Sequence, residues 1–246
     1  FLNELSIACK NVEKFFTVIP VIIFEKSEIN KYLKLKEYFE SKKSQLIPQI
    51  LLNKNGSGFS SCLNYGINNT FSKWILRIDT DDHITNKRIL NQLNIMKKNN
   101  LDMSSGFMQD EKGNFLKYPK NKFGLITNLL IGTNPIAHPS VCIRRDALLI
   151  KYNSDLNRCE DFELWINLFL KSGFKWKCID YPLTIYSTER SKFKDEENAI
   201  QQIKIRLKYS IKLFIVSFAL FIGVFGNILR ILLGKNILLS LRRKLK

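Results

Sequence analysis

Strand and helix patterns alternate three times between residues 16 and 98, and this alternation most constrains the fold. Three short runs are nearly continuous in apolar and β-branched residues, as strands buried on both faces of a sheet are: 16–25, 49–53 and 74–79. Each run is followed by a helical pattern, the third of which is capped by Asn86. This order predicts an α/β fold, with an open, mostly parallel sheet flanked by helices and right-handed crossovers.

Beyond residue 100 the alternation gives way to shorter strands and longer helical stretches. A hairpin is expected over 103–118, followed by three strands over 140–144, 174–180 and 183–187. The helix predicted over 160–172 is closed by Gly173, and from Glu196 the pattern is helical to the end. We therefore expect an α/β domain over 1–195 and a basic, apolar helical region over 196–246.

The positive charge is concentrated at the C-terminal end. The 246 residues carry a formal net charge of +17, but the last acidic residue is Glu197, and residues 203–246 hold ten cations. The first 202 residues therefore carry only +7. A folded domain that binds nucleic acid would carry more of the charge itself, so no nucleic-acid partner is expected. Five cysteines without a C-x-x-C spacing also argue against a zinc site or a disulfide framework.

Three carboxylates follow the third predicted strand within four residues: Asp79, Asp81 and Asp82. They repel one another unless a cation or hydrogen-bond donors offset their charge. Ligands bind at the carboxyl ends of strands in open α/β sheets, so Mg²⁺ or Mn²⁺ held there together with substrate phosphates would fit. The alternative is a solvated acidic turn in which Asp82 caps the next helix.

A second acidic pair, Glu160 and Asp161, opens the helix predicted over 160–172. The helix dipole favours carboxylates at this end, which is a sufficient structural reason for them. The functional alternative makes one of them a general base, positioned by a rigid helix start.

Six stretches in one consistent order resemble the family 2 glycosyltransferases, enzymes of the GT-A fold in bacterial surface-polysaccharide synthesis. The likeness is strongest to the branch that assembles exopolysaccharide, capsule and O-antigen. The stretches are Leu63–Gly66, RIDTDD at 77–82, Arg88 with Gln92, NPIAHPSV at 134–141, RRDAL at 144–148 and EDFELW at 160–165. The resemblance implies a Rossmann-like nucleotide-binding half and an acceptor-binding half.

The same resemblance implies a set of donor-binding residues. Asp79 would approach the ribose or phosphate side of a nucleotide sugar. Asp81, with Asp79 beside it, would bind Mn²⁺ or Mg²⁺ that bridges the diphosphate, and Asp82 would support the cluster. Asn64 and Arg77 would also lie on the donor side.

Catalysis is implied for the second cluster. Asp161 matches the family's catalytic base, which takes the proton of the acceptor hydroxyl, and Glu160 is the other candidate. Trp165 would line the sugar site or belong to the core. His138 would contact the acceptor or hold its own loop through a backbone carbonyl, and Arg190 would meet a phosphate or be solvated.

The sequence departs from the family pattern near its start. The family's first strand, of the type S-V-I-I-P-x-Y-N, has no counterpart before Phe16, and Phe1–Glu4 resembles the start of the helix that follows that strand. We therefore expect the chain to begin inside a longer protein. Glu25 stands where the family has an acidic turn, and it is the expected substitute there for donor binding.

The tail contains an uncharged run of 14 residues, Leu213–Gly226, with basic residues on both sides. A spanning helix needs roughly 20 apolar residues. The run therefore favours a helix lying on the cytoplasmic membrane surface, where anionic headgroups attract the cations. A spanning helix, a core helix and a subunit-contact helix remain alternatives.

These features together predict an inverting, metal-dependent glycosyltransferase that uses a nucleotide sugar, with a UDP-linked donor expected. The acceptor would be a lipid-linked oligosaccharide at the cytoplasmic face of a bacterial inner membrane. One alternative is a phosphoryl-transfer or nuclease-type enzyme with two metals. Another is a degenerate, non-catalytic glycosyltransferase-like subunit that recruits a partner at the membrane.

Overall fold

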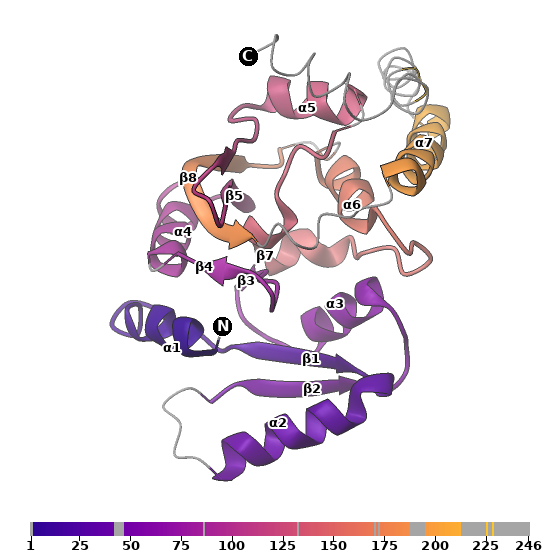
Figure 1. The fold of residues 1–246 in the computed structure, drawn as a ribbon. Coiled ribbons are helices and arrows are strands. Elements are labelled where there is room, and N and C mark those ends of the chain that lie inside the picture. Colours follow the sequence, from indigo (N-terminus) through magenta and orange to yellow (C-terminus); the bar gives the residue numbers. More distant parts are fainter. Residues whose placement is uncertain are drawn as a thin grey trace. The chain divides into compact units, whose positions relative to one another are not determined.

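The computed structural model describes residues 2–41, 47–85, 87–131, 133–169, 171, 173–186, 195–212, 225 and 228 (Figure 1). The chain forms two compact units. The first comprises Phe1–Tyr118 with Ala137–Thr188, and the second comprises Pro119–Ile136 with Glu189–Lys246. Each unit is described by itself.

The first unit contains a small parallel sheet of two strands. β1 (Val21–Glu25) pairs with β2 (Gln49–Asn53), so that Val21 lies opposite Gln49 and Glu25 opposite Asn53. Helices α2 (Ile29–Ser41) and α3 (Phe59–Asn68) both pack on these strands (Figure 1). A short 3₁₀ turn, Lys26–Glu28, joins β1 to α2. The carboxyl ends of β1 and β2 therefore lie side by side and precede the two helix starts.

β1 is shorter than the predicted strand over 16–25. Its pairing begins only after Pro20, which has no N–H to donate to a ladder. Phe16 and Val18 pack instead against a core cluster, with the Phe16 ring 6.2 Å from that of Trp74. The apolar run thus serves two packing tasks in sequence.

The second sheet of the first unit has the order β3-β7-β5-β8-β4, with β6 paired to β5. Its strands are β3 (Trp74–Leu76), β4 (His83–Ile84), β5 (Met103–Asp110), β6 (Phe115–Leu116), β7 (Cys142–Arg144) and β8 (Trp176–Tyr186). Only β5 and β8 run parallel, and the other pairs are antiparallel. The prediction of a mostly parallel sheet is therefore wrong, because β7 enters antiparallel between β3 and β5 and the chain stops making βα crossovers after α4 (Arg88–Lys98).

β8 replaces the two short strands predicted over 174–180 and 183–187. It stays paired to β5 through Pro182, and two register shifts between Gly106 and Met108 absorb the irregularity. Gly106 lies close to β8, since a Cβ there would be 2.5 Å from Leu183 Cδ1. A bulge of this kind bends a strand without ending it.

Helix α1 (Leu2–Lys10) and helix α4 share a core cluster with the second sheet. Buried side chains of α1 such as Leu5 and Ala8 belong to the same cluster as Ile89 and Met96 of α4. Helix α6 (Glu160–Phe169) is buried along most of its length, with Phe162, Trp165 and Leu168 fully enclosed. The first unit therefore has a continuous apolar interior that fixes α6.

The second unit contains α5 (Lys122–Ile131) and α7 (Asp195–Lys212) among its described residues. Arg206 of α7 is fully buried and donates two hydrogen bonds to the Leu129 carbonyl oxygen of α5, at 2.8 and 2.6 Å. α5 was not expected from the sequence. Apart from Phe225, the Leu213–Gly226 run lies outside the described residues. Within the described part of the chain, no helix combines the length and apolar character that a membrane crossing requires.

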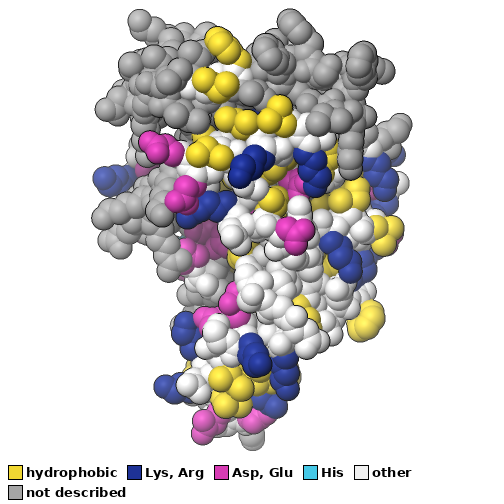
Figure 2. Space-filling model, turned by 90° about the vertical axis from the view of Figure 1, so that its right-hand side faces the viewer, with side chains coloured by type: hydrophobic (Ala, Val, Ile, Leu, Met, Phe, Trp, Pro, Cys, Tyr) yellow, Lys and Arg dark blue, Asp and Glu magenta, His cyan; other side chains and the backbone are white. Residues whose placement is uncertain are grey.

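Figure 2 shows one face of the molecule with its side chains coloured by type. Among the described residues of this face, basic and acidic side chains are interspersed, with apolar groups between them. The described part of the face therefore carries no continuous basic track of the kind that follows a nucleic-acid backbone.

Candidate active site

Arg77 and Asp79 form the first element of the site, directly after β3. Both terminal nitrogens of the guanidinium bind the two carboxylate oxygens of Asp79. The guanidinium also lies over the ring of Phe59, 5.2 Å from its centroid. Burial raises the pKa of Asp79, and the charge and hydrogen bonds of Arg77 partly offset this effect. Asp79 thus has a fixed cationic partner of its own.

Asp82 lies buried next to this pair. Its Oδ2 has no hydrogen-bond partner in the described structure. Burial, and then the charges of Asp79 and Asp81, raise the pKa of Asp82 from 3.8 to about 6. The three carboxylates therefore interact electrostatically as one cluster, which is under-compensated by the protein alone.

The cluster fits a divalent cation only if a substrate helps to hold it. Among the described residues, no group of three or more His, Cys, Asp or Glu side chains is arranged to bind a metal ion. Mg²⁺ and similar ions, however, are commonly held by one or two carboxylates plus substrate phosphates. The unpartnered buried oxygen of Asp82 is consistent with such a shared site.

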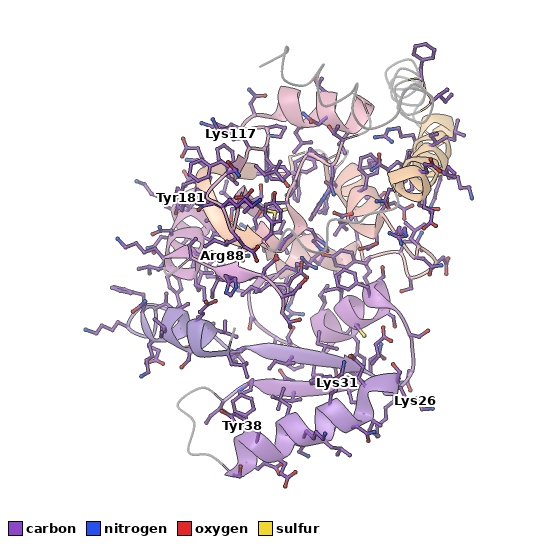
Figure 3. The ribbon with its side chains drawn as sticks, in the orientation of Figure 1. Lys26, Lys31, Tyr38, Arg88, Lys117 and Tyr181 are labelled. Carbon is purple, nitrogen blue, oxygen red and sulfur yellow. The ribbon has the colours of Figure 1, made fainter. Side chains whose placement is uncertain are left out.

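Arg88 anchors the cluster from below, on the first turn of α4 (Figure 3). It is fully buried and donates to the Arg77 carbonyl at 2.7 Å, the Gln92 Oε1 at 3.0 Å and the Thr184 Oγ1 at 3.0 Å. Gln92 in turn donates to the Ser140 carbonyl at 2.8 Å. Burial lowers the pKa of Arg88 to about 10, so it remains charged at neutral pH. This network joins the end of β3 to the segment after residue 137.

His138 sits within that segment, in an aromatic cluster. The rings of Phe59, Tyr152 and Trp165 lie 6.1, 5.4 and 5.7 Å from the imidazole. His138 is only 7% exposed, and its Nε2 forms a 2.7 Å hydrogen bond with the Tyr152 hydroxyl. Burial and the charge of Arg77 hold the pKa of His138 well below 6.5. Of its two readings, contact with the acceptor stays a prediction, while the loop-holding contact is made to a side chain.

Asn64 of α3 binds backbone rather than open space. Its Nδ2 donates to the Tyr152 carbonyl at 2.8 Å, and its Oδ1 accepts the Tyr152 N–H at 3.0 Å. This two-point contact ties α3 to the segment before α6. A donor-binding role for Asn64 stays a prediction, and any such role must share the amide with Tyr152.

Glu160 and Asp161 lie in the first turn of α6, preceded by a strained residue. Cys159 has φ of 59°, the left-handed region that non-glycine residues seldom adopt. Burial and then the charge of Asp161 raise the pKa of Glu160 to about 7, and Arg77 acts in the opposite direction. The carboxylate pair and Arg77 are thus within electrostatic reach of each other, which brings both predicted acidic clusters into one site.

Trp165 lies one turn after Asp161 on α6 and is fully buried. Its Nε1 has no hydrogen-bond partner in the described structure. The residue thus belongs to the core while its ring edge contacts His138, and a role in the sugar site stays a prediction.

Glu25 caps the turn after β1. One carboxylate oxygen accepts the Gly58 N–H at 2.9 Å, and the side chain also forms a capping box with Glu28. Asn53 accepts the N–H of Asn55 in the same β2–α3 loop. Glu25 therefore fastens the loop that starts α3, and its donor-binding role stays a prediction. Arg190 lies outside the described residues.

Two residues of the site were not foreseen, Phe59 and Tyr152. Phe59 contacts both Arg77 and His138, and Tyr152 contacts Asn64 and His138. Neither belongs to a spaced motif, because each reaches the site through contacts between residues far apart in the chain. No signal in the sequence pattern alone marks them.

Sequence comparison gives one family match and one curated relative. The family model described as "Glycosyl transferase family 2" matches residues 27–161, more than half of the chain. An "Uncharacterized glycosyltransferase" from Rickettsia felis (strain ATCC VR-1525 / URRWXCal2) is 31% identical over 127 residues, covering 49% of this chain and 21% of the relative. The chain thus spans about a fifth of the length of that relative.

Solved structures share the fold. S. aureus TarS 1–349 has a TM-score of 0.60 at 15% identity, covering 84% of this chain and 60% of that one. Its complex with UDP-GlcNAc has a TM-score of 0.60 at 14% identity, covering 84% and 61%. The mannosyltransferase PcManGT from Pyrobaculum calidifontis, in complex with GDP-Man and Mn²⁺, has a TM-score of 0.53 at 11% identity, covering 91% and 69%. At these identities the likeness shows a GT-A-like α/β fold with a mixed sheet flanked by helices.

Proposed function

This chain belongs to glycosyl transferase family 2, and we propose that it transfers a sugar from a nucleotide sugar to an acceptor hydroxyl with inversion. The observation that carries the proposal is the meeting of two acidic clusters around Arg77. The Asp79–Asp82 cluster follows β3, and Glu160 with Asp161 opens α6, yet the charge of Arg77 acts on members of both.

The proposed reaction divides the work between the clusters. On the donor side, Asp79 and Arg77 orient the ribose and phosphate end. Asp161 accepts the proton of the acceptor hydroxyl as its oxygen attacks the anomeric carbon. The C1–oxygen bond to the diphosphate breaks as the new glycosidic bond forms, and the nucleoside diphosphate leaves. Glu160, with a pKa near 7, is the second candidate for the base.

Asp81 is the proposed metal ligand, with Asp79 or Asp82 beside it. A bound Mn²⁺ or Mg²⁺ would supply charge neutralisation on the leaving diphosphate. What supports this assignment is the unpartnered buried oxygen of Asp82 and the raised pKa values of Asp79 and Asp82. The named ligands of TarS and PcManGT motivate the choice of UDP, GDP and Mn²⁺ as probes.

The test is the thermal stability of the protein with Mn²⁺ and UDP or GDP, singly and together. A ligand that binds the native state raises the apparent stability by RT ln(1 + [L]/Kd). We expect a shift that needs both metal and nucleotide, is lost in Asp81→Asn and persists in the exposed control Asp155→Asn. Release of UDP or GDP from a panel of nucleotide sugars then measures turnover, which Asp161→Asn should abolish. Full turnover in both Asp81→Asn and Asp161→Asn would overturn the assigned roles.

We also propose a lipid-linked saccharide acceptor at the cytoplasmic membrane surface. Support comes from the ten cations of residues 203–246 and from α7, where Ile200 and Leu207 are 47% and 48% exposed and Lys204 lies on the solvent side. Apolar and basic groups on one helix favour binding to an anionic interface. Sedimentation with phosphatidylglycerol vesicles should retain the protein, and phosphatidylcholine vesicles should not. Equal retention by both would count against an electrostatic contribution.

A non-catalytic subunit is the second candidate, and one observation favours it. Glu25, at the turn where the resemblance expects a donor-binding acid, has its carboxylate engaged by the Gly58 N–H and the capping box. A folded protein that shows neither the joint metal–nucleotide shift nor turnover with any donor would support this candidate.

A further inference from the structure

We propose that Tyr152 is a positioning residue, whose clamped backbone and hydroxyl–His138 hydrogen bond hold the first turn of α6 in its working place. The activity part of this inference rests on the proposed function. The structural part stands on contacts among three segments of the first unit: α3, the 138–140 turn and α6.

The backbone of Tyr152 is held from α3. The amide of Asn64 both donates to its carbonyl, at 2.8 Å, and accepts from its N–H, at 3.0 Å. Such a reciprocal pair fixes the peptide plane as well as the position, because both backbone groups of one residue are satisfied by one planar amide. The segment that leads to α6 therefore starts from a fixed point.

The side chain of Tyr152 is held from the opposite side. Its hydroxyl shares the 2.7 Å hydrogen bond with His138 Nε2, and the two rings lie 5.4 Å apart. His138 is neutral in this buried setting, so the bond joins two uncharged groups, and burial keeps the phenol protonated by raising its pKa. A phenol can donate one hydrogen bond and accept another, so its oxygen can still accept when its proton is engaged.

The held segment contacts α6 directly. Asn153, the next residue, donates to Glu163 Oε2 at 2.8 Å, and His138 contacts the ring of Trp165 on the same helix. The charges of Asp161 and Glu160 both act on the Tyr152 phenol. The strained φ of Cys159 at the helix start needs such support, since a left-handed residue persists only when its surroundings hold it.

Tyr152→Phe removes the hydroxyl and leaves the ring, so it tests the hydrogen bond alone. Tyr181→Phe is the matched control, because Tyr181 on β8 also loses a side-chain hydrogen bond, to Asn91 (Figure 3). In Tyr152→Phe we expect amide hydrogen exchange at Glu163–Trp165 to accelerate about tenfold, as loss of one buried hydrogen bond would produce. Exchange in α4 should stay unchanged, and Tyr181→Phe should leave α6 unchanged.

Turnover supplies the second readout. Tyr152→Phe should lower the release of nucleoside diphosphate by about tenfold or more, as small misplacements of catalytic groups do. The joint shift with Mn²⁺ and UDP should persist, because the donor-side carboxylates are untouched. Unchanged α6 exchange in Tyr152→Phe would overturn the inference. If the unmodified protein turns over no donor, the proposed function fails, and the exchange measurement alone decides the role of Tyr152.

Discussion

Asp79 is gripped by both terminal nitrogens of Arg77, a residue only two positions earlier in the chain. The pair is mostly buried, with 11% of the Arg77 side chain and 30% of the Asp79 side chain exposed. Because the backbone carbonyl of Arg77 is itself bound by Arg88, this ion pair is mounted on the core and not on a free loop. The first carboxylate of the site is therefore fixed before any ligand arrives.

A double-mutant cycle of Arg77→Met and Asp79→Asn should reveal a coupling energy of about 1–3 kcal/mol in urea unfolding at pH 8. Arg77→Met alone should be the more damaging single change, because it leaves a buried carboxylate without its cation. At pH 4 the cost should shrink, since the raised pKa of Asp79 favours its neutral form there. Additive effects at both pH values would show that the pair contributes little.

Asp82 should make the protein less stable as the pH rises from about 4 to about 6. Its pKa is raised from 3.8 to about 6 in the folded protein, so folding is favoured by the bound proton below 3.8 and loses that contribution as the pH passes 6. Asp82→Asn should therefore melt higher above pH 6, by about 2–4 °C for ~1 kcal/mol, and match the parent near pH 4. Melting curves across this range, beside exposed Asp155→Asn, measure the difference. A lower melting temperature for Asp82→Asn at pH 8 would contradict the sign.

Arg88→Met should cost about 3 kcal/mol or more in chemical unfolding. The change strands three buried acceptors, on Arg77, Gln92 and Thr184, each worth about 1–3 kcal/mol when left unsatisfied. Lys98→Met, at an exposed position of the same helix, is the control and should change stability by less than about 0.5 kcal/mol. Equal effects of the two substitutions would show that the buried network is not limiting.

Cys159→Gly should stabilise the fold by about 0.5 kcal/mol, because glycine adopts a φ of 59° without strain. Cys159→Val should destabilise it, since a β-branched side chain is poorly tolerated in that region. Cys62→Gly in the interior of α3 provides the contrast and should cost about 1 kcal/mol. Thermal melts of the three variants are sufficient, and a stabilised Cys159→Val would exclude strain as the explanation.

Local patterns predicted several elements well. The strand over 49–53 forms as β2 with the same bounds, and the helix expected over 57–68 forms as α3 and also ends at Asn68. The six-motif resemblance is confirmed at the level of the family, while the polysaccharide branch stays a prediction. Period and composition suffice for these features because each depends on neighbours in the chain.

Other features could not be predicted in this way. β4 has two residues and exists because His83 and Ile84 meet β8, some hundred positions later. α5 lies between segments whose composition resembles loops, and its Leu129 carbonyl is bound by Arg206. The orientation of β7 depends on which strand edges remain available after β5 has formed, a question that no window of sequence answers.

The sequence by itself determined the family, the alternating first half and the two acidic clusters, because these are properties of residue type and spacing. Only the tertiary structure decided which of those residues interact. It gave Asp79 to Arg77, left an oxygen of Asp82 without a partner, gave the amide of Asn64 to Tyr152, and brought Glu160 within electrostatic reach of Arg77. Burial and hydrogen bonding between distant segments set these relationships, and with them the pKa values on which the proposed chemistry depends.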